Sequence, residues 1–151
     1  MDISKNGLEF IKLFEGFSAV PYRDVAGLKT VGFGHLIKEG EVFGAISSLE
    51  ATALLHKDAQ EAVDCVNDNV TRPVSQSQFD ALCSFVYNIG CTSFKSSTLL
   101  RMVNDNRHDA VTGQFRRWTF AGGKASQGLL NRRIAEANLY SRSDYGRVKT
   151  T

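Results

Sequence analysis

The 151-residue chain contains only two prolines, three cysteines and no long apolar run. No stretch approaches the roughly 20 apolar residues in a row that a membrane-spanning helix needs. The N-terminus, Met1-Asp2-Ile3-Ser4-Lys5-Asn6, lacks the basic and then apolar pattern of a signal peptide, so we expect synthesis in a cytosol. A net charge of +2, from 18 Lys and Arg against 16 Asp and Glu, gives no support to nucleic-acid binding.

The cysteines Cys65, Cys83 and Cys91 are odd in number and show no Cys-x-x-Cys spacing. This pattern supports neither a zinc site nor a closed disulfide framework. We interpret all three as small buried or half-buried thiols. Pairing of two of them in an oxidising compartment remains open from the sequence.

Composition indicates one folded domain. Hydrophobic residues make up 42% and charged residues 23% of the chain, which is close to the average of globular proteins and excludes a disordered chain or a coiled coil. The length fits one domain, since domains run to roughly 100–200 residues. We therefore expect a single core, arranged in one or two lobes.

The first third of the chain predicts a mixture of helix and sheet. Apolar spacing favours a first helix over residues 7–14. From residue 20 to residue 37, β-branched, aromatic and leucine residues alternate with Gly27, Gly32 and Gly34, which is typical of short strands and tight turns. The prediction for this segment is a small β-meander.

The remainder predicts helices. The capping-box pattern of Ser47 and Glu50 opens a helix of about 19 residues, and the same pattern in Ser75 and Gln78 opens another that ends at Gly90. Further helices are expected at about 97–104, 107–118 and 126–142, with a loop at 121–123 and a mobile tail over 145–151.

Glu15 interrupts an apolar helical stripe, because it follows Leu8 and Ile11 by seven and four residues. A carboxyl group there would be partly desolvated, which favours the protonated form that a general acid needs. The alternative is a frayed helix end whose side chain points into water. Taken singly, Asp24 reads as a turn residue and Thr30 as an ordinary strand residue. Two carboxyl groups near one helix end are nevertheless the minimum set for glycoside hydrolysis.

Three short stretches then carry a resemblance: Leu13-Phe14-Glu15-Gly16, Tyr22-Arg23-Asp24, and Lys29-Thr30-Val31-Gly32-Phe33-Gly34-His35. Their Glu-x8-Asp-x5-Thr spacing, followed by Gly-x-Gly-His, resembles the active-site signature of the phage lysozymes, glycoside hydrolase family 24. Residues 85–90, 97–101, 117–118 and 128–133 are also similar to family positions. The resemblance covers about residues 7–142.

The resemblance implies an α+β, two-lobed lysozyme-like fold. One catalytic domain would span 1–151, with an N-terminal β-meander lobe at about 13–58 and a helical C-terminal lobe at about 67–142. The helix at 7–14 would pack with the helical lobe, and a long helix would join the two lobes.

The resemblance also implies site residues. Glu15 would be the general acid, and Asp24 and Thr30 would hold the attacking water in an inverting reaction. Leu36, Tyr87 and Thr98 would bind substrate. Either Arg132 or Arg133 would supply a cation beside the acid, although both also read as a solvated or cleft-facing basic surface on a helix. His35 would play a supporting structural role rather than bind a metal.

The predicted function is that of an endolysin muramidase, which hydrolyses the β-1,4 bond between N-acetylmuramic acid and N-acetylglucosamine in peptidoglycan. A lytic transglycosylase and a non-catalytic cell-wall-binding module are the alternatives. Asp24 argues against the transglycosylase, which needs one acid and no water-positioning carboxylate, and the presence of both Glu15 and Asp24 argues against the binding module. No cofactor or metal is expected. The predicted enzyme is a monomer that binds glycan strands, accumulates in the host cytoplasm and reaches the wall in the periplasm with the help of a holin-like membrane protein.

Overall fold

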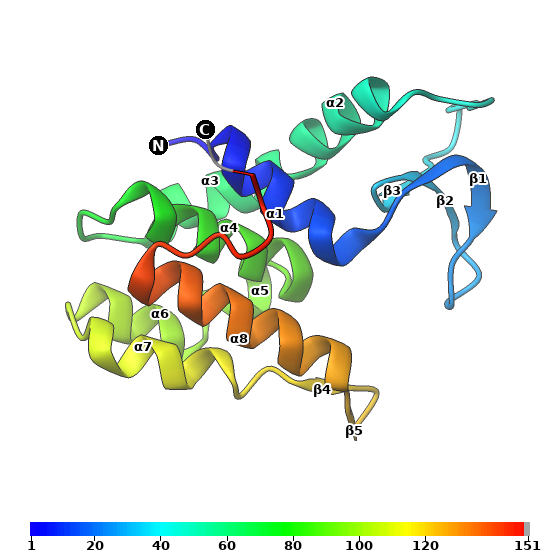
Figure 1. Ribbon diagram of the computed structural model, residues 1–151. Helices are drawn as coiled ribbons and strands as arrows, with labels where there is room; N and C mark the ends of the chain where they lie inside the picture. The colour runs from blue at the N-terminus through cyan, green and yellow to red at the C-terminus, as the bar shows by residue number, and fades with distance from the viewer. Residues whose placement is uncertain (150–151) are drawn as a thin grey trace.

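The computed structural model describes residues 1–149 and confirms the α+β architecture. A small antiparallel sheet lies at one end of the molecule, and helices fill the other end (Figure 1). Helix α1 and the segment α2–α3 run between the two regions, which form the predicted lobes. Within this described range, no helix is both long and apolar enough to cross a bilayer.

Helix α1 (Lys5–Glu15) confirms the first predicted helix. The Ser4 side chain caps it by accepting a hydrogen bond from the Gly7 amide, and Phe10 and Ile11 bury its inner face. Gly16 ends the helix with a φ of 68°, a conformation that favours glycine. The helix therefore stops directly after Glu15.

Strands β1 (Ser18–Arg23), β2 (Lys29–Gly32) and β3 (His35–Leu36) form the predicted meander, in the order β1-β2-β3. Thr30 pairs with Leu36, and the neighbouring Val31 pairs with His35. Because successive side chains in a strand point to opposite faces, Thr30 and Leu36 share one face, while Val31 and His35 share the other. Helix α2 packs against β2 and β3.

The expected long connecting helix is bent. It consists of α2 (Ser48–Asp58) and α3 (Gln60–Asn69), which meet at the buried Ala59. The Ala59 amide donates to Leu55 O, and the Val63 amide donates to Ala59 O, so the hydrogen-bond ladder continues through the bend. Since α2 packs on the sheet and α3 packs on the helical lobe, the two halves follow different partners.

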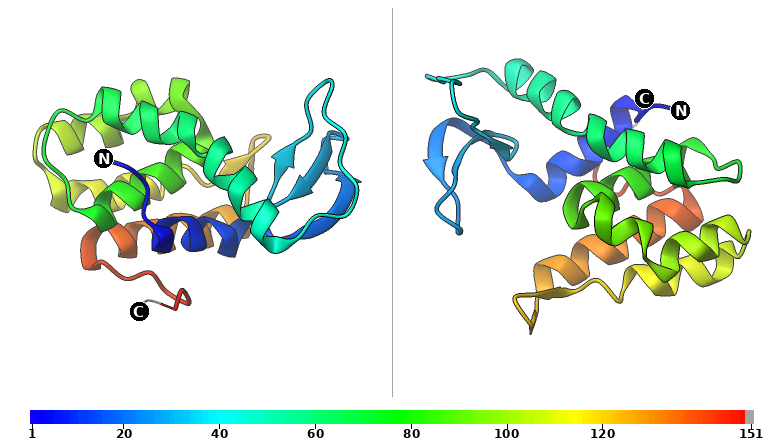
Figure 2. Two further views of the ribbon diagram at one scale, coloured as in Figure 1. Left: turned by 90° about the horizontal axis from the view of Figure 1, so that it is seen from above. Right: turned by 180° about the vertical axis from the view of Figure 1, so that it is seen from behind.

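The helical lobe contains five helices: α4 (Gln76–Ile89), α5 (Cys91–Lys95), α6 (Thr98–Asn104), α7 (His108–Phe115) and α8 (Gln127–Arg142). The capping boxes at Ser47 and Ser75 are both present. Helix α5 was not predicted, and α7 is shorter than expected. The expected loop is a hairpin of β4 (Phe120–Ala121) and β5 (Lys124–Ala125), which lies at the end of the lobe nearest the sheet (Figures 1 and 2).

The prediction of three thiols is wrong for two cysteines. Cys65 of α3 and Cys91 of α5 form a disulfide across a Cα–Cα distance of 5.9 Å, whereas Cys83 is a free, buried thiol. Gly90 ends α4 with a φ of 90° and turns the chain back toward α3. This juxtaposition depends on tertiary packing, so cysteine spacing gave no sign of it.

The prediction of a mobile tail is wrong for Tyr145 to Val148. The Tyr145 hydroxyl donates a 2.6 Å hydrogen bond to Asp80 Oδ2, and Val148 packs against the core. Burial, followed by that hydrogen bond, raises the pKa of Tyr145 to about 12. Asp80 also accepts hydrogen bonds from the amide and hydroxyl of Ser4, so one buried carboxylate fastens both ends of the fold to α4. Residues 150–151 of the predicted tail lie outside the described range.

Candidate active site

Glu15 lies at the end of α1 with 23% of its side chain exposed. Its Oε1 atom is 3.6 Å from Nη1 of Arg132, a residue of α8 whose side chain is 5% exposed. The structure therefore places this carboxyl group in a half-buried position beside a cation, as expected. Of the two candidate arginines, Arg132 and not Arg133 is the cation that faces Glu15.

The same carboxyl group lies against the sheet. A methyl group added to Gly34, in the turn between β2 and β3, would stand 3.8 Å from Glu15 Oε2. The rings of Phe17 and Phe33 pack beside this turn with their centroids 5.1 Å apart. Glu15 thus occupies the position where the sheet meets α1 and α8.

Asp24 and Thr30 are joined through the backbone of Leu28. The Leu28 amide donates to Asp24 Oδ1 at 2.8 Å, and the Thr30 hydroxyl donates to Leu28 O at 2.9 Å. Asp24 is half-buried and Thr30 is buried. The interpretation of Asp24 as a turn residue is therefore correct, and the same turn fixes its carboxylate relative to the Thr30 side chain.

The three predicted substrate-binding residues have different surroundings. Tyr87 is half-buried on α4, and burial followed by the nearby Glu15 carboxylate raises its pKa above the usual range. Leu36 is 49% exposed on the Thr30 face of the sheet. Thr98 begins α6 and accepts a hydrogen bond from Arg101. Among residues 1–149, no hydrogen bond joins Thr98 to Glu15.

The side chain of Arg132 is held on several sides. Its Nη2 donates to Ser84 O at 3.1 Å, its Nε lies 3.3 Å from Glu136 Oε2, and its guanidinium lies over the Phe14 ring at 5.4 Å. Arg132 and Arg133 are 4% and 0% exposed, so the interpretation of this pair as a solvated surface is wrong. Both side chains point into the helical lobe, because buried hydrogen-bond acceptors lie there.

Glu136 is the main residue that sequence reasoning missed. It is fully buried and contacts both arginines, with Arg133 Nε 2.7 Å from its Oε1, while Ser84 donates to its Oε2 at 2.6 Å. Burial lowers the pKa of Arg133, and the Glu136 carboxylate opposes that effect. The spacing of three and four residues from the arginines to Glu136 was a usable signal, since such residues are neighbours on a helix.

His35 has the structural surroundings that were expected. Its Nδ1 is 2.7 Å from Asp58 Oδ2, and its Nε2 is 3.1 Å from Glu41 Oε1. The Lys38 amide and then His35 lower the pKa of Glu41. His35 thus connects the sheet to α2 and to the segment after β3, on the face opposite Thr30.

Comparison of the sequence with known proteins gives matches to phage lysozymes and endolysins. Residues 12–136 match the family model described as phage lysozyme. An endolysin of Bacillus phage PZA is 41% identical over 143 residues, which cover 93% of this chain and 55% of that protein. The chain spans about half the length of this protein and of its counterpart from Bacillus phage B103.

Solved structures of similar proteins superpose on nearly the whole chain. An endolysin from Escherichia coli O157:H7 phage FAHEc1 superposes with a TM-score of 0.90 at 34% identity, covering 97% of this chain and 98% of that one. The muramidase domain of SpmX from Asticaccaulis excentricus superposes with a TM-score of 0.83 at 35% identity, covering 93% and 97%. Both likenesses include the sheet and the helical lobe.

Proposed function

The chain belongs to the phage lysozyme family, and from this premise we propose that it is an endolysin muramidase. Its reaction is hydrolysis of the β-1,4 bond between N-acetylmuramic acid and N-acetylglucosamine in bacterial peptidoglycan, leading to host cell lysis. One observation carries the proposal. A half-buried carboxyl group, Glu15, faces a buried arginine at the boundary with a sheet that holds Asp24 and Thr30 in one hydrogen-bonded turn.

Each of the three residues has a separate task in the proposed reaction. Glu15 donates a proton to the leaving glycosidic oxygen, since only a protonated acid can assist departure of the sugar. Asp24 accepts a proton from the attacking water, and Thr30 orients that water. Leu36, Tyr87 and Thr98 contact the sugars on either side of the bond. An inverting outcome follows if water enters from the side opposite Glu15, a geometry that needs about 6.5–9.5 Å between the two carboxyl groups.

The direct test is Glu15→Gln, which keeps the shape of the side chain and removes its acidic proton. We expect clearing of permeabilised Gram-negative cells to slow by about 10²–10⁴-fold, the usual contribution of general acid catalysis. Glu9→Gln is the matched control, because Glu9 lies on the same helix and forms only a surface pair with Lys12. Retention of more than about a tenth of the wild-type rate would remove Glu15 from this role.

Product analysis tests the reaction itself. Mass spectrometry of digested peptidoglycan should show new reducing ends, whereas anhydro ends would indicate a transglycosylase. The anomeric configuration of the first product, measured by NMR, should be inverted. Asp24→Asn should lose turnover and retain binding, because it keeps the hydrogen bond that closes the turn and loses the base.

The last part of the proposed function is how the enzyme reaches its substrate. Synthesis in the host cytoplasm and a substrate in the periplasm require a route across the inner membrane, and we assign that route to a holin-like protein acting with a monomeric enzyme. The Cys65–Cys91 disulfide supports action in an oxidising compartment. Co-expression with a holin should trigger lysis that expression of the chain alone does not, and size-exclusion chromatography tests the monomer.

A further inference from the structure

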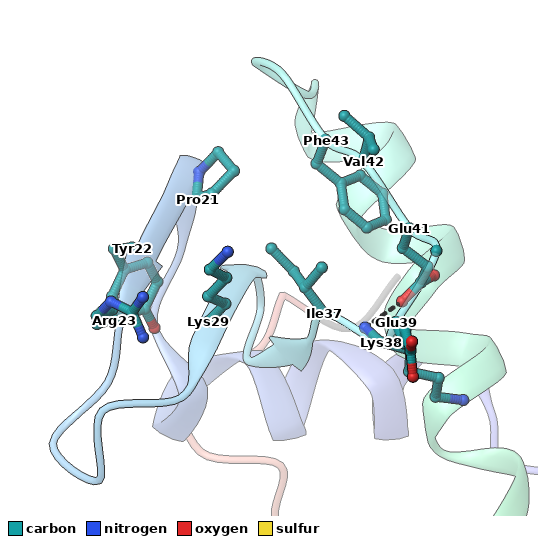
Figure 3. A pocket seen from close by; sticks show the side chains of 11 residues that line it. Pro21, Tyr22, Arg23, Lys29, Ile37, Lys38, Glu39, Glu41, Val42 and Phe43 are labelled. Carbon is teal, nitrogen blue, oxygen red and sulfur yellow. Dashed lines mark hydrogen bonds between the residues drawn. The ribbon is translucent and has the colours of Figure 1, made fainter.

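A second groove lies on the sheet lobe, away from Glu15. Figure 3 shows Lys29 of β2 and Ile37 rising between Pro21 on one side and Phe43 on the other. Its volume is about 600 Å³, and its walls come from β1, β2 and residues 37–43. Neither Glu15 nor Arg132 borders it.

Strand register separates this groove from the proposed active site. Ile37 donates its amide to Lys29 O, and Lys29 pairs with Arg23 on β1. Side chains alternate along a strand, so Lys29 points to the face opposite Thr30. The part of the groove at Lys29 therefore lies on the face opposite Thr30, whereas Tyr22, which pairs with Thr30, borders the groove on its β1 side.

The outer wall of the groove is held in place by contacts with His35 and with β1. Glu41 accepts a 2.7 Å hydrogen bond from the Lys38 amide and lies against His35. The Phe43 ring packs edge-on against the His35 ring at 5.5 Å. The amide of Ile46 then donates to Ala19 O on β1, which fixes the end of the segment. A wall fixed in this way needs little ordering when a ligand binds.

The groove combines apolar walls with charged side chains of both signs: Arg23, Lys29, Lys38, Glu39 and Glu41. Val42 is 94% exposed, and Phe43, Ile37 and Pro21 add further apolar surface. Among residues 1–149, the groove residues that form no ion pair are Arg23, Lys29, Lys38 and Glu39. A fitting ligand therefore carries a carboxylate, an ammonium group and small apolar side chains within a few residues.

We propose that this groove binds the stem peptide of peptidoglycan, an inference that rests on the proposed function for its choice of ligand. Stem peptides alternate alanine methyl groups with free carboxylates, and those with diaminopimelate carry a free ammonium group. Lys29 binds a carboxylate, Glu39 binds the ammonium group, and the methyl groups lie against Val42 and Phe43. Occupation of this groove by a neighbouring stem keeps the enzyme on the insoluble wall between catalytic events.

The test is an NMR titration of the isotope-labelled full chain with the tetrapeptide N-acetyl-L-Ala-γ-D-Glu-diaminopimelate-D-Ala, whose single ammonium group belongs to diaminopimelate. We expect shift changes at Lys29, Ile37 and Val42 and a dissociation constant of about 1 mM. Lys29→Ala should weaken binding about three- to fivefold, as for an exposed ion pair, while Lys29→Arg retains it. Lys95→Ala is the matched control, because Lys95 is exposed on α5 in the other lobe.

Acetylation of the peptide ammonium provides a second, independent measurement. It should weaken binding to the wild type and leave binding to Glu39→Gln unchanged, since the partner of the ammonium group is then already absent. Absence of shifts at about 10 mM peptide, or shifts centred on Glu15 and Tyr87, would overturn the proposal. Wall hydrolysis by the wild type, measured beside the titration, separates the two hypotheses. Peptide binding without hydrolysis refutes the proposed function alone, and hydrolysis without peptide binding refutes the groove alone.

Discussion

The two lobes of the molecule are built in different ways. Of the eleven large hydrophobic side chains that are exposed among residues 1–149, nine lie between Leu13 and Leu49, in and around the sheet. Within that same range, all of which the structure describes, Val31 is the only buried hydrophobic residue. Most of the continuous core is instead formed by the helices that follow residue 50 and by α1. The sheet lobe therefore depends on hydrogen bonds, ion pairs and its contact with α2 more than on a core of its own.

The residues of the proposed active site come from both lobes and lie at their junction. Arg132 is fixed from the helical side by Ser84 and Glu136, whereas Asp24 and Thr30 are fixed from the sheet side by the turn at Leu28. Segments with few buried apolar contacts open at lower free energy than a packed core. We infer that the sheet lobe opens at lower free energy than the helical lobe, which holds Arg132 beside Glu15.

The largest effect should come from truncating the core of the helical lobe. Phe85 packs edge-on against Phe94, Phe115 and Trp118, and it is fully buried. Phe85→Ala should lower the free energy of unfolding by about 3–5 kcal/mol, from lost burial and a residual cavity. Denaturant unfolding measures this change. Val25→Ala in the sheet lobe is the control, and a comparable loss there would contradict the contrast between the lobes.

Removing the disulfide should have the next largest effect. Cys65 and Cys91 join α3 to α5 across a sequence separation of 26 residues. The double variant Cys65→Ser, Cys91→Ser should lose about 2–4 kcal/mol, because the unfolded chain regains the freedom that the bond removes. Hydrogen exchange should show faster opening in α3 and α5 than in the sheet. Faster opening of the sheet alone would show that the disulfide stabilises the sheet lobe instead.

Within the sheet lobe, substitution of His35 should lower the free energy of unfolding most. This buried residue forms side-chain contacts in a lobe that has few buried hydrophobic residues. His35→Asn should cost about 1–3 kcal/mol, since Asp58 and Glu41 then lose a partner. Hydrogen exchange should report the loss in β2 and β3 first. Unchanged exchange in these strands would mean that α2 holds the sheet without His35.

The same network gives a pH dependence with a defined sign. The folded protein lowers the pKa of Glu41 from its ordinary value of 4.5, so the ionised form stabilises the fold. That contribution is present above pH 4.5 and is lost as the pH falls through the lowered folded value. Glu41→Gln should therefore flatten the acid side of a stability profile measured by denaturant unfolding. An unchanged acid limb would exclude Glu41 as a source of it.

Local signals in the sequence predicted the fold well. The capping residues Ser47 and Ser75, the stop at Gly90 and the glycine spacing of residues 27–34 each act through their immediate neighbours, and each element is present. The bend at Ala59 and the Cys65–Cys91 bond were missed because they arise from tertiary contacts. The choice of Arg132 over Arg133 likewise depends on the rotation of α8, which places Arg133 against Glu136 and Asn88.

The smallest expected effect concerns Glu15 and has the opposite sign. Partial burial of this carboxyl group beside Arg132 has a cost to folding, because even a paired charge is expensive to desolvate, and the proposed role as general acid accounts for its presence there. Its removal does not isolate the arginine, which keeps Glu136, Ser84 and the Phe14 ring. Glu15→Met should therefore abolish activity and raise stability by about 1 kcal/mol, or roughly 2–4 °C in the unfolding midpoint. Glu9→Met on the same helix should leave activity intact, and a lower midpoint for Glu15→Met would identify Glu15 as a structural residue that stabilises the junction.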